Sequence, residues 1–241
     1  MSTALALLTG ATAACSAGWA ITARTLRRRT AELERQERDG LTGLWRREAF
    51  EKRAPAALAA GNVIALLDLD GFKQINDTKG HAAGDDVLRA TAARLVAELG
   101  ESALIARLGG DEFALITALD IPAARDQLDQ LTTALTSPVP VPGASELAVG
   151  VSLGVAWLRD LPAFNATGPA TRTAPFWRAV LSEGLSAADA AMYAAKALRH
   201  DWQLFDRAVD PVRPALRIEH APRRRYREHG PAAFSTAAHG G

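Results

Sequence analysis

The sequence predicts an α+β domain with a central, mostly antiparallel sheet, preceded by one helix of membrane-spanning length. Apolar runs and helical stripes alternate in the order strand, helix, hairpin, helix, strand, helix. A Gly-Gly pair between two apolar runs indicates the hairpin and places Asp111 and Glu112 at its tip. Residues 1–23 contain no charged side chain. A hydrocarbon core of about 30 Å needs roughly 20 residues of helix, so this segment is long enough to span a membrane.

The length and composition of the chain are sufficient for one hydrophobic core. With 241 residues, 48% of them hydrophobic, it suits one domain with flanking segments. The formal net charge is +1, and arginines crowd residues 24–38 and 213–227, so the overall charge predicts no specific nucleic-acid partner. The single cysteine, Cys15, excludes an internal disulfide, and no clustered Cys and His residues offer a zinc site.

The apolar segment 1–23 has three interpretations. Its length favours a membrane anchor, although its many Ala, Thr, Ser and Gly residues make insertion marginal. A cleaved export signal and a soluble N-terminus are the alternatives, and the lack of a basic stretch before the apolar run weakens the export interpretation. Arginines follow from Arg24 onward. The positive-inside rule therefore predicts a single-pass protein of the inner (cytoplasmic) membrane with the chain after the apolar segment in the cytoplasm.

Residues 24–38 are predicted to form a charged linker helix. Arginines alternate with glutamates around Leu26 and Leu33. This pattern fits a stalk with a short heptad-like seam, and it fits equally a solvated juxtamembrane helix with no pairing role, because a coiled coil normally needs more heptads.

The globular domain is predicted over residues 39–207. It begins with a turn at Asp39, followed by a helix over 46–58. Residues 62–69 form a nearly continuous apolar strand that is expected to be buried on both faces. The strand ends in Asp68-Leu69-Asp70, where the period of two places both carboxylates on one face. The Leu69 carbonyl lies between them as a further oxygen ligand for a metal.

Residues 71–86 are polar and punctuated by glycine, which indicates a binding loop after the buried strand. Asp85 or Asp86 is expected to cap the next helix, whose apolar stripe belongs to the core. That stripe consists of Leu88, Ala92, Leu95, Val96 and Leu99.

The acidic hairpin tip comes next, between buried strands over 103–106 and 113–116. Gly109 and Gly110 carry no side chain, so a phosphate can approach the backbone there while Asp111 or Glu112 holds a hard cation beside it. An ordinary acidic turn is the alternative interpretation of the hairpin taken alone.

The remaining elements complete the sheet and its helical cover. The pattern predicts a helix over 121–136, a strand over 147–157 and a loop over 158–175. Ser186 is expected to cap a final helix that ends at Leu198, and 202–205 to form an edge strand. Residues 208–241 lack periodicity and are rich in Pro, Arg, His and Gly, so they are predicted to form a disordered basic tail.

This order of elements is that of an α+β domain resembling the ferredoxin-like palm. If the hairpin strands flank the strand that ends at Asp68, this carboxylate meets Asp111 and Glu112. Two carboxylates and a carbonyl suit Mg²⁺, or Mn²⁺ in its place, with phosphates completing the metal's shell. The arrangement is typical of nucleotidyl transfer.

From about Asp39 to Phe205 the sequence resembles the GGDEF-domain diguanylate cyclases. The resemblance rests on an ordered set of motifs that covers most of the predicted domain. These are Asp39-x-Leu41-Thr42-Gly43-Leu44, Asp68-x-Asp70-x-Phe72-Lys73-x-x-Asn76-Asp77, Gly80-His81, Gly84-Asp85, Gly109 to Phe113, Ser152-x-Gly154 and Tyr193-x-Ala195-Lys196.

The resemblance implies that two GTP molecules are joined in a head-to-tail homodimer to give cyclic di-GMP and pyrophosphate. It implies a Mg²⁺ site at Asp68, the Leu69 carbonyl and Asp111, with Glu112 as a further carboxylate at the metals. Asp111 would also accept the 3′-hydroxyl proton, and Lys73 would neutralise charge on the phosphates, so Asp111, Lys73 and Glu112 are the implied catalytic residues. The implied substrate-binding residues are Asn76, His81 and Asp85 for guanine and ribose, Lys196 for the distal phosphates, and Gly109 and Gly110.

Three positions depart from the family's pattern. Arg46 stands where the family often has Asn, and Arg199-His200-Asp201 stands where it has Gly-Arg-Asn, so His200 is expected to hold triphosphate more weakly. Gly100 and Ala103 replace the Arg and Asp of the family's product-inhibition site, which is therefore expected to be missing. The alternative to an active cyclase is a GTP-binding regulatory module with weak or no catalysis.

Overall fold

The computed structural model describes residues 19, 22–29, 32–142, 146–166, 168 and 172–207. Six strands are placed in this part of the chain: β1 (Trp45–Arg46), β2 (Val63–Asp70), β3 (Leu104–Gly109), β4 (Glu112–Thr117), β5 (Gly150–Trp157) and β6 (Trp202–Leu204). The helices of the domain are α2 (Arg47–Ala60), α3 (Phe72–Lys79), α4 (His81–Leu99), α5 (Ala124–Thr136), α6 (Pro162–Asn165) and α7 (Ala174–Leu198), with a short 3₁₀ turn η1 (Leu158–Asp160).

The strands form one mixed six-stranded sheet in the order β1-β3-β4-β2-β5-β6. The four central strands pair antiparallel, as the sequence predicts. The two edge strands, β1 and β6, pair parallel with β3 and β5 and were not anticipated as parallel partners. The sheet is therefore antiparallel at its centre and parallel at both edges.

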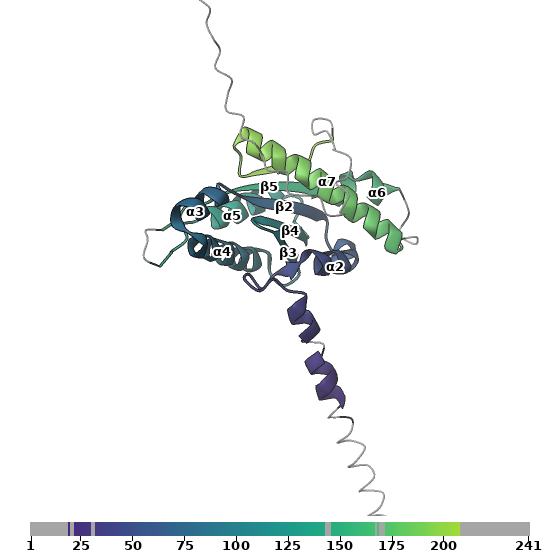
Figure 1. Ribbon diagram of the computed structural model, residues 1–241. Coiled ribbons are helices and arrows are strands. Elements are labelled where there is room, and N and C mark those ends of the chain that lie inside the picture. The colour runs from purple at the N-terminus through teal and green to yellow at the C-terminus, as the bar shows by residue number, and fades with distance from the viewer. Residues whose placement is uncertain are drawn as a thin grey trace, which may run out of the picture.

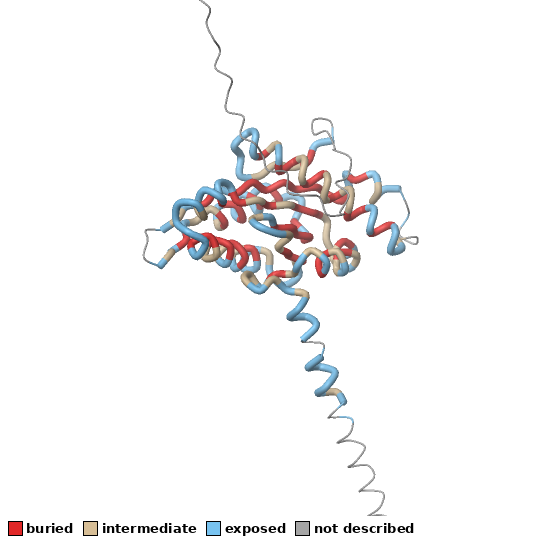
Figure 2. The backbone as a smooth tube through the Cα atoms, in the orientation of Figure 1, coloured by how far each residue is buried: buried red, intermediate tan, exposed pale blue. Residues whose placement is uncertain are grey.

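Helices cover both faces of this sheet (Figure 1). Odd-numbered residues of β2, including Val63 and Leu67, pack with α4 and α5, whereas Ile64 and Leu66 pack with α2 and α7. Figure 2 shows the buried backbone concentrated in the sheet and on the inner sides of these helices. Because the pleat has a period of two, Asp68 continues the series of residues that faces α7.

Gly154 brings α7 directly onto β5. A Cβ atom at this position would overlap the Ala188 carbonyl oxygen and the backbone of Met192. The absence of a side chain at Gly154 therefore allows α7 to lie close to the sheet. This short distance also determines which residues of β2 the side chains of α7 can reach.

The prediction of a binding loop over 71–86 is wrong, because these residues form α3 and the start of α4. The two helices pack tightly at Gly84, where a Cβ atom would clash with the Asn76 side chain. Asp85 and Asp86 lie inside α4 rather than capping it, since that helix begins at His81. Most of α3 is solvent-exposed, and its polar composition mimics that of a loop.

The final helix is longer than predicted. It spans 25 residues, so Ser186 lies in its middle and does not cap it. Its first two residues, Ala174 and Pro175, fall in the predicted loop, and the buried Phe176, Trp177 and Val180 extend the helix's apolar stripe well before Ser186. Pro175 stands in the first turn, where its missing N–H disturbs no helical hydrogen bond.

The segments outside the domain are described only in part. Residues 22–29 and 32–36 are helical and largely exposed, in agreement with a charged linker helix. Among the described residues, no helix has both the length and the apolar character needed to cross a membrane. Most of the predicted anchor and all of the predicted tail lie outside the described residues, so both stay predictions.

Gly154→Ala is expected to destabilise the domain, because the added methyl group meets backbone atoms of α7 that cannot move independently. The overpacking predicts a loss of about 1–3 kcal/mol in the free energy of unfolding, measured by urea titration. Gly40→Ala is the matched control, since no atom lies within 4 Å of a Cβ built there. Equal stability of the two variants would show that α7 can shift without penalty.

Candidate functional site

The candidate site lies where β2, the β3–β4 hairpin and α7 meet. Antiparallel pairing sets Asp68 directly opposite Glu112 on β4, and Asp68 is opposite Ser152 on β5. Asp111 precedes Glu112 in the hairpin turn, so three predicted carboxylates lie at one end of the sheet. Leu69 is buried with its side chain on the opposite face, packed in the core formed with α4 and α5.

The hairpin is confirmed, with a one-residue change in its turn. Gly109 pairs with Glu112, so Gly110 and Asp111 form the two-residue turn, and the register shifts between Arg107 and Gly109. The φ angles of Gly109 and Gly110 are 152° and 56°, values that side-chain-bearing residues rarely adopt. Glycine is thus required by the backbone here, in addition to leaving room for a phosphate.

Lys196 of α7 is the cation that contacts Asp68. Its Nζ lies 2.7 Å from Asp68 Oδ1. Burial raises the pKa of the Asp68 carboxyl; the Lys196 ammonium opposes that rise, while the charges of Asp111 and Asp70 add to it. The structure therefore places Lys196 at the carboxylate end of β2.

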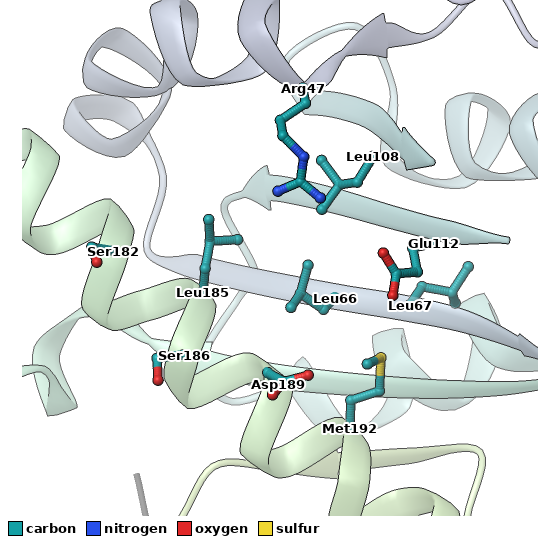
Figure 3. A pocket seen from close by; sticks show the side chains of 10 residues that line it. All are labelled: Arg47, Leu66, Leu67, Leu108, Glu112, Ser182, Leu185, Ser186, Asp189 and Met192. Atoms are coloured by element: carbon teal, nitrogen blue, oxygen red, sulfur yellow. The ribbon is translucent and has the colours of Figure 1, made fainter. Parts of the chain in front are cut away.

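Glu112 faces a hollow of about 140 Å³ between the hairpin, β2, α2 and α7. Although Glu112 as a residue is exposed, its carboxyl group is partly buried, and this burial raises its pKa, as do the nearby charges of Asp68, Asp111 and Asp189. The Arg47 guanidinium acts in the opposite direction. Figure 3 shows Arg47 extending from α2 toward the hollow that Glu112 and Asp189 also line.

These donors fit a divalent metal that completes its shell with substrate. Among the described residues, no three His, Cys, Asp or Glu side chains gather closely enough to form a metal cage of their own. Mg²⁺ is commonly held by one or two carboxylates together with substrate phosphates, so a full protein cage is not needed. Directly opposed like charges are unfavourable unless a cation separates them, and Lys196 already supplies one positive charge at Asp68.

The residues predicted to contact guanine and ribose lie on α3 and α4. Asn76 packs against Gly84 at the crossing of these helices, and the half-buried Asp85 follows directly. His81 is exposed at the start of α4. The side chain of Lys73 is 90% exposed and its Nζ lies 3.0 Å from Asp77, so it is not gathered with the carboxylates of β2 and the hairpin.

Sequence reasoning missed the residue that fixes the hairpin turn. Arg107 donates from Nε and Nη2 to the Gly110 carbonyl, at 2.9 and 2.7 Å, and from Nη1 to Asp39 Oδ1 at 3.1 Å. Asp39 Oδ1 also accepts the Thr42 hydroxyl and backbone N–H at 2.7 and 2.9 Å. The signal was present, since Asp39-x-Leu41-Thr42 is one of the motifs that carry the family resemblance and Arg107 stands two residues before Gly109. Spacing along the chain does not reveal that Asp39 and Arg107 are in contact.

The end of α7 carries the departure at residues 199–201. Arg199 has a φ of 56°, the left-handed conformation that commonly ends a helix and that favours glycine. This explains in physical terms why glycine suits the position. His200 is exposed, and its backbone N–H donates to the Ala195 carbonyl at 3.0 Å.

Comparisons with known proteins identify the family of this domain. A family model described as diguanylate cyclase, GGDEF domain, matches residues 36–167. An uncharacterized 19.3 kDa protein of Streptomyces ambofaciens is 43% identical over 182 residues, which cover 74% of this chain and 87% of that protein. Diguanylate cyclase TpbB of Pseudomonas aeruginosa is 39% identical over 127 residues, which cover 49% of this chain but only 29% of the relative.

The fold is also found in a solved structure. The coiled coil and GGDEF domain of DgcB from Caulobacter crescentus, in complex with c-di-GMP, is 27% identical with a TM-score of 0.60. The match covers 80% of this chain and 97% of that one.

Glu112→Gln is expected to stabilise the metal-free protein. Because the pKa of Glu112 is raised in the folded protein, ionisation of its carboxyl group lowers the free energy of unfolding. This loss is fully present at pH values above the raised pKa. It disappears as the pH falls from the raised pKa to the ordinary pKa of a glutamate. At neutral pH we expect the melting temperature to rise by about 1–3 °C, since the group is only partly buried.

The matched control for this measurement is Glu101→Gln, which changes an exposed glutamate outside the site. The advantage of the Glu112→Gln variant should shrink as the pH is lowered in a series of thermal melts. A melting temperature that falls on substitution would mean that the charge of Glu112 is stabilising in the metal-free site.

Proposed function

Because the chain belongs to the GGDEF family, we propose that it is a diguanylate cyclase, which condenses two GTP molecules into cyclic di-GMP with release of pyrophosphate. The observation that carries this proposal is the meeting of Asp68, Glu112 and Lys196 beside the Gly110-Asp111 turn. Carboxylates for a metal, a cation for phosphates and an open backbone turn lie within one small region. This is the donor set that phosphoryl transfer to a hydroxyl needs.

We assign a role to each of the predicted residues. Asp68, the Leu69 carbonyl, Asp111 and Glu112 would hold Mg²⁺ or Mn²⁺, which when bound would neutralise phosphate charge. Asp111 stands in the turn, and its carboxylate would accept the proton of a 3′-hydroxyl. Lys196 and Lys73 would bind phosphate oxygens from α7 and α3. The glycines of the turn leave space for the α-phosphate and the attacking ribose.

Guanine selection is proposed for the α3–α4 crossing. Asn76 and Asp85 lie close to Gly84, where the absence of a Cβ allows the two helices their close approach. A carboxylate that accepts from N1–H and N2–H₂ favours guanine over adenine, because the edge of adenine presents the wrong donors and acceptors. His81, at the start of α4, would contact the ribose side.

The reaction also needs two copies of the chain. One site binds one GTP, and the product contains two linkages related by symmetry, so a head-to-tail homodimer places each 3′-hydroxyl at the other α-phosphate. The exposed hairpin tip and the open end of the sheet are compatible with that approach. Membrane attachment through residues 1–23 would add a second constraint that keeps two copies close.

The second candidate function is a GTP-binding regulatory module. The observation that favours it is the presence of Arg199-His200-Asp201 at the end of α7 where the family has Gly-Arg-Asn, which puts His200 in place of the arginine at the middle position. Binding of GTP without formation of cyclic di-GMP by the purified protein would support this candidate over the cyclase.

Asp111→Asn is expected to abolish synthesis of cyclic di-GMP, because it removes both a metal ligand and the proton acceptor. A loss of at least about 100-fold is expected for an interaction made in the transition state. The measurement is mass spectrometry of the product after incubation of the full chain with GTP and Mg²⁺. Asp120→Asn, an exposed residue outside the site, is the control for a charge change alone.

The outcome is informative only if Asp111→Asn still folds, which a thermal melt establishes. A folded variant that keeps more than a small fraction of the wild-type rate would remove Asp111 from its proposed role.

Weak feedback by the product is a second consequence of the proposed activity. Gly100 and Ala103 carry no group able to bind a phosphate-rich dinucleotide. Arg94 and Arg107 are the arginines that could replace the missing one, and both are engaged. Arg94 donates to the carbonyls of Leu135, Ser137 and Pro138 at 3.1, 2.7 and 2.8 Å. Arg107 is held by Gly110 and Asp39.

We therefore expect low-micromolar cyclic di-GMP to leave the initial rate with GTP unchanged in progress curves. Noncompetitive inhibition at that concentration, relieved by Arg94→Ala, would show that Arg94 leaves its carbonyl partners to capture the product.

A further inference from the structure

Lys196 occupies the position of a counter-ion at the candidate metal site. Its Nζ lies 2.7 Å from Asp68 Oδ1, and the side chains of Lys196 and Asp68 are 38% and 16% exposed. This is a charge-assisted contact made by a carboxylate that is largely withdrawn from water. Lys196 can reach Asp68 because α7 packs closely against β5 at Gly154, next to β2 in the sheet.

The surroundings of Asp68 explain why a cation is needed there. Glu112 lies directly opposite on β4, and the charges of Asp111 and Asp70 act on the same carboxyl group. Like charges at opposed positions of a sheet destabilise the pair. In the metal-free protein the ammonium of Lys196 is the group that compensates this charge at Asp68.

A divalent cation would bring twice the charge of the ammonium to the same carboxylate. Two cations on neighbouring positions repel each other, and lysine can retreat because its ammonium sits on a flexible four-carbon stem. Binding of the metal and the Lys196–Asp68 contact are therefore alternatives. Breaking this contact is part of the free energy of metal binding.

We propose that Lys196 is the interim counter-ion of Asp68 and is displaced when a divalent cation binds. The ammonium then becomes available to the substrate's phosphates only in a metal-loaded site. This second step rests on the proposed function, whereas the competition between Lys196 and the metal does not. Before the metal binds, the ion pair neutralises the charge of Asp68. While the pair persists, the Lys196 ammonium is not available to bind a phosphate.

The test measures binding of Mn²⁺ to the full chain in the absence of nucleotide. Binding is monitored by electron paramagnetic resonance, because the signal of free Mn²⁺ decreases as the ion binds to the protein. Lys196→Met removes the competing charge and should bind Mn²⁺ about 3- to 10-fold more tightly, the range expected for one half-exposed charge beside a carboxylate. Lys196→Arg keeps the charge and should stay within about twofold of the wild type.

Matched variants separate this effect from a general change in charge. Lys79→Met removes an exposed lysine at the last position of α3, which has no proposed role in metal or phosphate binding, and it should leave Mn²⁺ affinity unchanged. Adding Asp68→Asn to Lys196→Met should abolish the gain, because Asp68 is the carboxylate for which the two cations compete. Lys196→Gln replaces Lys196→Met if the latter does not fold in a thermal melt.

Equal or weaker Mn²⁺ binding by Lys196→Met or Lys196→Gln would overturn the proposal. An equal gain in Lys79→Met would also overturn it, since the effect would then be one of net charge. A wild-type protein that makes no cyclic di-GMP would contradict the proposed function, but the Mn²⁺ comparison would still decide the role of Lys196.

Discussion

The antiparallel register between β2 and β4 decides where the charges of this site lie. It runs from the pair Val63 and Thr117 to the pair Asp68 and Glu112. Because side chains alternate across a sheet, a shift by one residue would turn Asp68 toward α4 and place Leu67 or Leu69 under α7. The buried leucines of β2 on the α4 face prevent that shift, so the hydrophobic core holds the carboxylates in register.

This register also creates an electrostatic problem that the helices solve. Two opposed carboxylates with a third beside them are unfavourable in a partly buried site, and burial together with these neighbouring charges raises the pKa values of both Asp68 and Glu112. Lys196 compensates Asp68 from α7, and Arg47 acts on Glu112 from α2. The site thus concentrates negative charge at a cost in stability, and a divalent cation bound there would relieve that cost.

The hairpin tip is connected to the end of the linker by a short chain of polar contacts. Arg107 joins the Gly110 carbonyl to Asp39, and Glu37 just before it forms ion pairs with Lys52 and Arg53 of α2 at 2.9 and 2.7 Å. Trp45 is enclosed between the guanidinium groups of Arg38 and Arg53, 3.8 and 3.6 Å from its ring centroid. These contacts hold the end of the linker against the domain, and Figure 1 shows the linker helix leaving the domain beside β3 and α2.

The sequence by itself determined the elements with strong periodicity and the identity of the acidic site. The apolar run of β2, the Gly-Gly hairpin and the carboxylates at 68, 111 and 112 were all readable, because local patterning dictates strands and turns. The helix α3 and the first turn of α4 were not, since a polar surface helix resembles a loop in composition and the close packing at Gly84 depends on the folded structure. The start of α7 before Ser186 was not predicted either, although Phe176 and Val180 are buried there. Tertiary structure alone decided that Lys196 contacts Asp68 and that Arg107 joins Gly110 to Asp39. Each of these contacts joins residues far apart in the chain or in different elements, and their distance depends on how α7 and the linker lie against the sheet, which no local pattern encodes.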